Sequence, residues 1–158
     1  MVCVKALGRA MCAASCLLLA ACGTEPASPE QQVRALIESV QQSIEEGSVR
    51  QVGDLLHEGY SDPRHANRYA AVRTLFGITQ RHRGVHLFTV IKTIDLTAQQ
   101  DSADAVVYVA MTGVPVESMQ ALVSLKADLY RFDLGLVEER GEWLVLSARW
   151  ERMDSSLL

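Results

Sequence analysis

The segment from Tyr60 to His65, YSDPRH, places a phenol, a carboxylate and an imidazole within six residues. These groups suit general acid–base catalysis, in which Asp62 would act as the base if burial raised its pKa, and Tyr60 or His65 would donate the proton. A structural role competes with this one, because an Asp before a proline often accepts hydrogen bonds from nearby backbone N–H groups and stabilises a turn. We favour the turn as the role of Asp62, and the catalytic role is the alternative.

A pair of histidines, His82 and His86, has a spacing that would place both imidazoles on one face of a helix, as metal sites require. Gly84 lies between them, and the residues after it have the composition of a β-strand, so the shared face is lost. We therefore expect surface histidines near a helix end rather than a metal site. The sequence also has no nucleophile elbow, phosphate-binding glycine loop or CxxC pair, and we predict no cofactor.

Polar side chains on the predicted strands form a third candidate group. Tyr108 and Asp128 could orient a ligand if the concave face of the sheet carries them into a pocket. The interpretation that we favour is that Arg131, Asp133 and Arg149 form cross-strand ion pairs on a solvated face, each worth about 0.2–1 kcal/mol. We assign no catalytic residue, and the predicted pocket residues are Tyr60, Asp62, His65, Tyr108, Asp128 and Tyr130.

The helices that should position these groups come first in the chain. A capping-box pattern, SPEQ at residues 28–31, begins a helix that Gly47 ends. Two more helices are expected, a short one over residues 48–56 and one over residues 67–83, with a loop at 59–64 between them. The apolar stripe of the first helix consists of Val33, Leu36, Ile37, Val40 and Ile44.

After Gly84 the hydrophobic pattern changes from a helical period to that of strands. Strands are predicted over residues 85–96, 103–112, 126–138 and 143–150. Trp143 and Trp150 are seven residues apart, so we expect them on opposite faces of the last strand. Helices followed by four antiparallel strands form an α+β pattern. One face of the third strand carries Tyr130, Phe132, Leu134 and Leu136.

The N-terminal segment predicts export from the cytoplasm. Lys5 and Arg9 precede an uncharged apolar stretch, residues 10–21, which is shorter than the roughly 20 residues that a membrane-spanning helix needs. The motif LAAC at residues 19–22 resembles the lipobox of bacterial lipoproteins. That resemblance implies a signal peptide over residues 1–21, cleavage before Cys22, and acyl chains on Cys22 that anchor the protein to a membrane. An ordinary secretory signal with an incidental cysteine is the alternative.

The positions of the cysteines support the lipobox, since all four lie within the first 22 residues. A chain that starts at Cys22 has no second thiol, which excludes an intramolecular disulfide and a cysteine metal site. The net charge of −4 over the whole sequence and the pI near 5.5 argue against a nucleic-acid surface. Loss of Lys5 and Arg9 with the signal peptide leaves 13 basic and 19 acidic side chains, a formal charge of −6.

The residues after Cys22 predict where the domain sits. Gly23 follows the cysteine, and by resemblance to Gram-negative lipoproteins a residue other than Asp there implies the outer membrane, facing the periplasm. Residues 22–28 comprise the lipidated Cys22 and a short tether. Its segment GTEPA, residues 23–27, can span at most about 20 Å. We therefore expect the domain to lie close to the bilayer in the cell envelope.

The order of the elements and the paired final strands, LYRFDLGLVEERGEWLVLSARW, resemble the NTF2-like (SnoaL-like) superfamily. The resemblance covers residues 29–152 and leaves a tail at 153–158. It implies an α+β cone-shaped barrel, in which N-terminal helices pack on a curved antiparallel sheet of about four strands. An α+β sandwich of the cystatin type is the alternative fold.

The NTF2-like superfamily includes isomerases, dehydratases, hydrolases, ligand-binding domains and assembly modules, so the fold does not select a function. Because none of the catalytic motifs of these enzymes can be matched here, we expect a membrane-anchored, non-catalytic domain that binds a small apolar ligand or an envelope protein. A pocket enzyme of the isomerase, dehydratase or hydrolase kind is the alternative. The resemblance also implies a homodimer through the outer face of the sheet.

Overall fold

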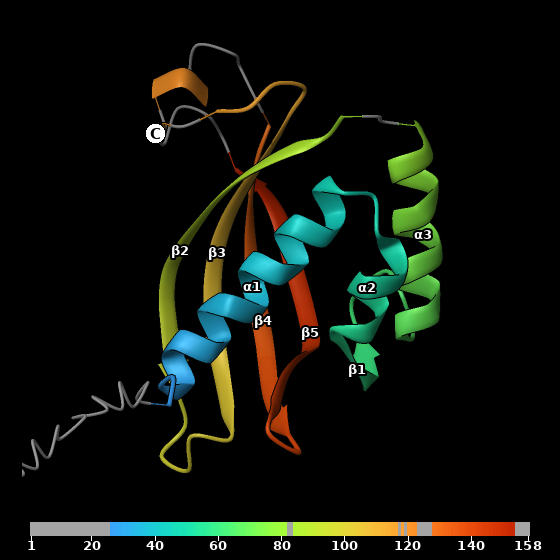
Figure 1. Cartoon of the computed structure of the whole chain (residues 1–158). Coiled ribbons are helices and arrows are strands. Elements are labelled where there is room, and N and C mark those ends of the chain that lie inside the picture. Colours follow the sequence, from blue (N-terminus) through green and yellow to red (C-terminus); the bar gives the residue numbers. More distant parts are fainter. Residues whose placement is uncertain (1–25, 82–83, 117, 119, 123–127, 154–158) are drawn as a thin grey trace, which may run out of the picture.

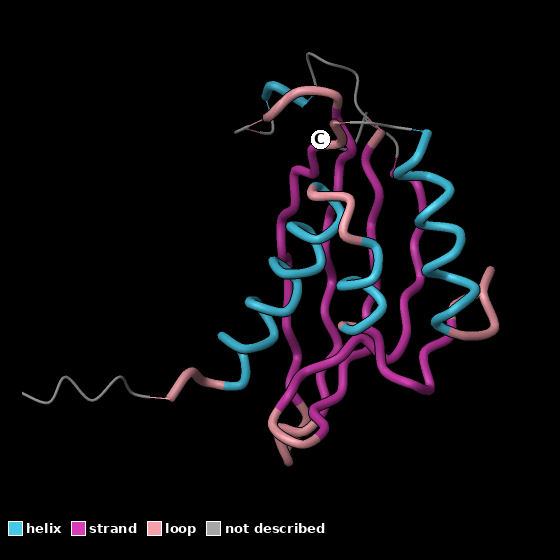
Figure 2. Tube along the Cα trace, turned by 45° about the vertical axis from the view of Figure 1, so that its right-hand side comes forward, coloured by secondary structure: helices cyan, strands magenta, loops and turns pink. Residues whose placement is uncertain are grey.

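The computed structural model describes residues 26–81, 84–116, 118, 120–122 and 128–153, so the lipobox and His82 lie outside the described residues. The strands form one sheet in the order β1-β5-β4-β3-β2. Figures 1 and 2 show the helices on one side of this sheet, with α1 crossing the long strands. In chain order the elements are α1 (Pro29–Glu45), α2 (Val49–Asp54), β1 (Leu56–Ser61), α3 (Arg68–Arg81), β2 (His86–Leu96), β3 (Ser102–Thr112), β4 (Leu129–Glu139) and β5 (Glu142–Met153).

The sheet has five strands, one more than the sequence predicts. The additional strand, β1, occupies Leu56–Ser61, where the end of a helix and the start of a loop were expected. It pairs parallel with β5, whereas the other neighbouring strands pair antiparallel. The segment LHEGYS has no alternating pattern, and its extended form depends on pairing with a distant strand. Local sequence therefore could not indicate it.

The first helix forms as the sequence predicts. Ser28 Oγ accepts a hydrogen bond from the Gln31 backbone N–H at 3.3 Å, and Gln31 Oε1 accepts one from the Ser28 N–H at 2.8 Å. These reciprocal bonds satisfy donors that a helix start leaves without partners. Val33, Leu36 and Ile37 are buried against the sheet, which orients α1 across the concave side.

The main core fills the space between the helices and the sheet. Leu136 of β4 is buried there together with the α1 side chains, and Phe132 and Leu134 pack against the same cluster. This confirms the predicted face of β4, because the three residues alternate along one strand. Other buried members of the cluster are Leu56, Tyr60, Ala103, Ala105, Val107, Trp143 and Val145.

The prediction that Trp143 and Trp150 lie on opposite faces is wrong. The register between β4 and β5 shifts, since Gly135 pairs with Ser147 while Leu136 pairs with Val145. A bulge of one residue exchanges the faces of all later side chains in the strand. Trp143 is therefore in the core, and Trp150 lies on the same side and stacks on Phe132 with ring centroids 5.8 Å apart.

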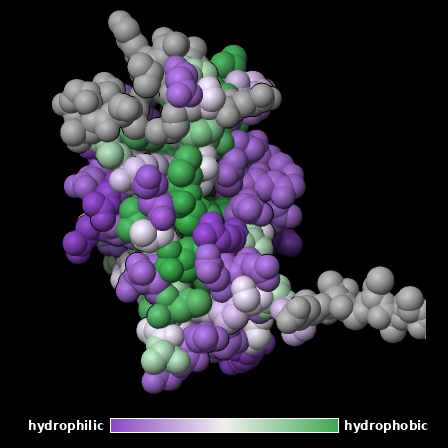
Figure 3. Space-filling view, turned by 90° about the vertical axis from the view of Figure 1, so that its left-hand side faces the viewer, coloured by the Kyte–Doolittle hydropathy of each residue, from purple (hydrophilic) through white to green (hydrophobic). Residues whose placement is uncertain are grey.

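The outer face of the sheet carries a second, smaller core. Ala110, Leu122 and Leu129 are buried in it, and Phe88 and Tyr108 pack against them. From the β2 side, Figure 3 shows a column of apolar surface running along the molecule between polar flanks. No helix in the described ranges has the length and apolar character that crossing a membrane requires.

Candidate functional site

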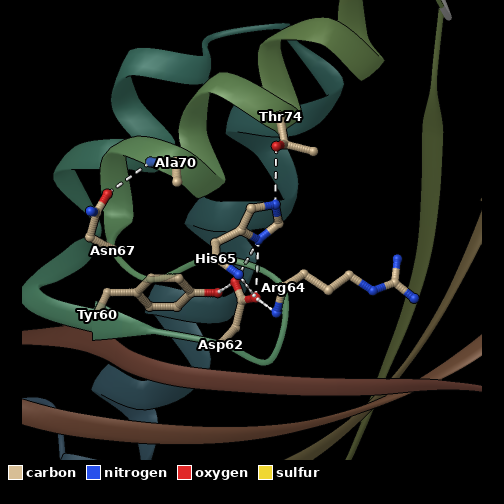
Figure 4. Close-up of polar contacts among 7 residues, drawn as sticks. All are labelled: Tyr60, Asp62, Arg64, His65, Asn67, Ala70 and Thr74. Carbon is tan, nitrogen blue, oxygen red and sulfur yellow. Dashed lines mark hydrogen bonds and ion pairs between the residues drawn. The ribbon is translucent and has the colours of Figure 1, made fainter.

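Three of the predicted pocket residues, Tyr60, Asp62 and His65, lie together at the end of β1 and in the loop that leads to α3 (Figure 4). Asp62 Oδ1 accepts hydrogen bonds from the backbone N–H groups of Arg64 and His65, both at 2.8 Å. Asn67 Oδ1 accepts from the Ala70 N–H at 3.0 Å and caps α3. The loop thus has the side chain-to-backbone bonds that stabilise an Asp turn before a helix.

The Asp62 carboxylate also binds two side chains. The Tyr60 hydroxyl donates to Oδ2 at 2.8 Å, and His65 Nδ1 lies 2.9 Å from the same oxygen. The Asp62 side chain is only 1% exposed, so four donors from three residues surround a carboxylate that water barely reaches. We refer to Tyr60, Asp62, His65 and Thr74, which is described below, as the Asp62 cluster.

The Asp62 cluster shifts the pKa values of two of its acids in opposite directions. Burial opposes ionisation of Asp62, but the hydrogen bonds from the Arg64 backbone and from His65 and Tyr60 together hold its pKa below the ordinary value. Burial, and then the hydrogen bond to Asp62, raise the pKa of Tyr60 well above that of a free phenol. Asp62 is therefore ionised and Tyr60 is protonated at neutral pH. A catalytic Asp62 would require a raised pKa, whereas the pKa of Asp62 is lowered here.

His65 extends the cluster to α3. Its Nε2 lies 3.0 Å from Thr74 Oγ1, and its side chain is 15% exposed. Because the carboxylate only accepts, Nδ1 donates to Asp62, and in the neutral ring Nε2 then accepts from the Thr74 hydroxyl. The order Asp62–His65–Thr74 is that of a catalytic triad.

A triad also needs donors that stabilise the charge developing on a substrate oxygen. Thr74 lies inside α3, where helical hydrogen bonds engage the backbone N–H groups, and among the described residues its hydroxyl contacts His65 alone. Among the residues that the structure describes, the cluster therefore has the proton-transfer part of a triad without its oxyanion part. Its hydrogen bond between His65 and Thr74 links the β1–α3 loop to α3.

Trp150 of β5 covers the cluster from the sheet side. The His65 and Trp150 rings are 6.5 Å apart with an interplanar angle of 21°, and the Arg64 guanidinium carbon lies 5.1 Å from the Trp150 ring centroid. Two residues of this site, Thr74 and Trp150, were not predicted. Thr74 has no local motif, and the face of Trp150 depends on the bulge, so tertiary structure alone brings them together.

The other predicted pocket residues are not part of the cluster. Tyr130 shares the concave face of β4 with Phe132, whereas Tyr108 lies on the outer face, where Lys92 Nζ is 5.5 Å from its ring centroid. Asp128 is exposed and forms an ion pair with Arg152. The structure thus brings Tyr60, Asp62 and His65 together and places Tyr108 and Asp128 elsewhere.

The expected ion pairs on the strands are present in a different arrangement. Arg131 NH2 lies 2.7 Å from Asp133 Oδ1, so the pair forms within β4 rather than across strands. Asp133 lies opposite Arg149 in the register, but the ion pairs of the described chain do not include Arg149. The described ranges also contain no group of side chains that could hold a metal ion.

Two open hollows lie on the described surface. One, of about 420 Å³, lies between α1 and α2, and the other, of about 200 Å³, lies where α1 ends. Neither includes a predicted pocket residue, because the core fills the concave side of the sheet beneath α1. The larger hollow is lined by Ser39, Gln42, Ser43, Glu46, Gln51, Asp54 and Leu55.

Comparisons with known proteins identify the fold. No protein-family model matches the sequence, and no curated protein matches it. A candidate scytalone dehydratase from Novosphingobium aromaticivorans is similar in structure, with 15% identity, a TM-score of 0.62, and coverage of 79% of this chain and 84% of that chain. A candidate dehydratase of the NTF2-like family from Streptomyces avermitilis has 14% identity and a TM-score of 0.63, over 80% of this chain and 97% of that chain.

A third similar structure is that of Bd1075 from Bdellovibrio bacteriovorus, with 11% identity and a TM-score of 0.60. The match covers 78% of this chain but only 40% of Bd1075, so this chain corresponds to less than half of that protein. Identities this low establish architecture and not activity. The chain therefore has the NTF2-like fold that its sequence predicts.

Proposed function

We propose that this protein is a membrane-anchored bacterial lipoprotein whose NTF2-like domain binds a partner in the cell envelope without catalysing a reaction. The observation that carries the non-catalytic part is the state of Asp62. Its carboxylate is the best candidate for a base in the chain, and it is buried, ionised and already bound by four donors. A general base must instead present a free lone pair to a substrate proton.

The shape of the domain favours a protein partner over a small apolar ligand. Binding sites for small apolar ligands are concave and mostly apolar, and they enclose most of the ligand. Here Val33, Leu36 and Leu136 occupy the space between α1 and the sheet, and the larger hollow is open and lined mainly by polar residues. In the described part of the chain, the domain therefore offers surfaces rather than an enclosed apolar cavity.

The membrane anchor is supported by the sequence of the N-terminus. LAAC at residues 19–22 closes a segment with two basic residues followed by an uncharged apolar stretch, as lipoprotein signals do. Metabolic labelling with a palmitate analogue should tag the wild-type protein and not Cys22→Ala. Continued labelling of Cys22→Ala would contradict attachment at this residue, and fractionation of the envelope would show whether the protein is in the outer membrane.

The binding function is tested by purification of the lipoprotein in detergent from its own cells. We expect a protein to co-purify in a constant ratio, and mass spectrometry of the same sample would reveal a bound small molecule. The homodimer implied by the fold is tested by light scattering of the purified protein. Recovery of the lipoprotein without any protein partner would contradict the proposal.

An enzyme is the second candidate, and the Asp62–His65–Thr74 chain is the observation that favours it. Two of the structurally similar proteins are also described as candidate dehydratases. This function predicts turnover of ester or hydroxy-carbonyl substrates that is lost in His65→Gln and retained in His57→Gln. His57 is the matched control, since it lies on β1 outside the cluster, with its Nε2 3.3 Å from a Glu139 carboxylate oxygen.

A further inference from the structure

The outer face of α3 exposes more apolar surface than a solvated helix requires. Tyr69 and Phe76 are 72% and 54% exposed, the two highest values among the large apolar side chains of the described residues. They are two helical turns apart, so they lie on one face, with Arg73 between them. Gln80 continues the same line, and all four are exposed. We refer to Tyr69, Arg73, Phe76 and Gln80 as the α3 stripe.

The α3 stripe belongs to a strongly basic part of an acidic protein. Residues 63–94 contain six Arg or Lys side chains and no Asp or Glu. In the remainder of the chain from Cys22 onward, 7 basic side chains stand against 19 acidic ones. A local charge opposite to that of the body directs the orientation of an approaching partner and disfavours partners of the wrong sign.

Two of the three arginines of α3, Arg73 and Arg81, are available to a partner. Within the described chain, the ion pairs do not involve Arg73 or Arg81, so neither guanidinium has a carboxylate beside it. The Arg68 guanidinium carbon lies 5.2 Å from the Tyr69 ring centroid, a cation–π contact that restrains both side chains. Side chains held in place in this way lose less entropy on binding.

We propose that the α3 stripe, together with the neighbouring Arg81, docks an acidic segment of another envelope protein. Carboxylates of that segment would pair with Arg73 and Arg81, and its apolar side chains would cover Tyr69 and Phe76. Arg and aromatic side chains are enriched at protein interfaces and supply much of their binding energy. The inference deepens the proposed binding function and rests on it.

The charges around the stripe favour an acidic protein over an anionic membrane. Glu58, whose side chain is 86% exposed, lies 3.9 Å from Arg68 at the edge of the stripe. A lipid surface presents negative charge over its whole extent and would repel both Glu58 and the acidic body. A protein segment can present carboxylates to the arginines alone.

Photo-crosslinking in cells tests the proposal with the full-length lipoprotein. p-Benzoyl-phenylalanine replaces Phe76 in one variant and Val114 in the matched control, because Val114 is 52% exposed and follows β3 instead of belonging to α3. We expect a single protein adduct at position 76, about tenfold stronger than at position 114, which corresponds to about 1.4 kcal/mol of preference. Mass spectrometry should locate the crosslink in a segment rich in Asp and Glu.

Charge substitutions then decide whether the arginines provide the recognition. The double substitution Arg73→Glu and Arg81→Glu should reduce the adduct about tenfold or more, while Arg73→Lys with Arg81→Lys should retain most of it. Lysine substitutions at the carboxylates of the mapped segment should restore the adduct of the charge-reversed protein. Unchanged circular dichroism of the variants controls for loss of folding.

Four results would overturn the proposal: an adduct with phospholipid, an adduct with a second copy of this chain, an adduct unaffected by charge reversal, or no excess over position 114. If the charge-reversed protein still co-purifies with its partner, this inference fails and the proposed function stands. If the wild-type protein co-purifies with no protein, the proposed function itself fails. The two failures are therefore distinguishable.

Discussion

The Asp62 cluster and the α3 stripe adjoin each other, but their polar groups differ in burial and in hydrogen bonding. In the cluster, a carboxylate that is 1% exposed accepts hydrogen bonds from Tyr60, Arg64 and His65. In the stripe, Arg73 has no carboxylate beside it in the described chain, and Phe76 next to it is 54% exposed. Thr74 joins the two regions, because its hydroxyl contacts His65 from within α3.

This difference shows that residue type alone does not indicate which polar groups the fold leaves free for another molecule. The residues with the most catalytic chemistry, an acid, a phenol and an imidazole, satisfy one another and stabilise a loop. The residues of the α3 stripe, which match no catalytic pattern, expose charge and aromatic surface to solvent. Polar groups that are satisfied internally contribute to stability, and groups that are not satisfied remain available for binding.

The largest expected effect comes from removing the centre of the cluster. Asp62→Ala should lower the free energy of unfolding by about 3–5 kcal/mol, because it leaves buried donors without an acceptor. Urea denaturation measures this difference. Asp104→Ala is the matched control, since Asp104 is exposed on β3, and we expect a change within about 0.5 kcal/mol. Equal effects of the two substitutions would contradict the structural role of Asp62.

Acid should weaken the same cluster. Folding lowers the pKa of Asp62, so its contribution to stability is complete above the unfolded-state value of about 3.9 and is lost as the pH falls through the lower folded-state pKa. The difference in unfolding free energy between the wild type and Asp62→Asn should therefore narrow as the pH falls below about 4. Denaturation at several pH values checks this, and a constant difference would argue against an ionised Asp62.

Two tyrosines allow a direct comparison of the regions. Tyr60→Phe removes a buried hydroxyl that donates to a carboxylate, and we expect a loss of about 1.5–3 kcal/mol. Tyr69→Phe changes a side chain that is 72% exposed, and its effect should be within about 0.5 kcal/mol. Thermal unfolding of both variants provides the measurement. A larger loss of stability in Tyr69→Phe than in Tyr60→Phe would contradict the structural role of the cluster and the solvent-exposed role of the stripe.

A smaller effect is expected where the regions meet. Thr74→Val keeps the shape of the side chain but removes the hydroxyl bound to His65 Nε2, which should cost about 0.5–1.5 kcal/mol. Thr79→Val serves as the control on the same helix, because the Thr79 hydroxyl donates only to the Phe76 carbonyl one turn earlier. Urea denaturation of both variants measures the difference, and an equal loss in the two would contradict a specific contribution of the His65–Thr74 hydrogen bond.

The smallest effect on stability is expected in the stripe itself. Phe76→Ser should change the free energy of unfolding by about 0.5 kcal/mol or less, since the side chain is exposed and the two residues have similar helix propensity. Its effect on partner co-purification should nevertheless exceed that of Asp62→Asn. A strong loss of stability in Phe76→Ser would show that the stripe is a structural element instead of a binding surface.

Sequence patterns predicted the elements whose signals are local. The capping box at Ser28 begins α1, and the alternating residues of β4 supply the core face with Leu136, as expected. β1 was missed because a short segment without alternation becomes a strand only by pairing with β5. Of the predicted pocket residues, Tyr60, Asp62 and His65 meet because they are close in the chain, whereas Tyr108 lies on the other face of the sheet.

The sequence by itself determined the α+β class, the helical stripe of α1, the strand pattern and the turn at Asp62, because each follows from propensity and periodicity over a few residues. Tertiary structure decided the side of Trp150, the contact between His65 and Thr74, and the exposure of Tyr69 and Phe76. A bulge, a helix docking against a loop, and a face left uncovered all depend on residues distant in the chain. Whether Asp62 supports a fold or a reaction was therefore a question about its neighbours in space.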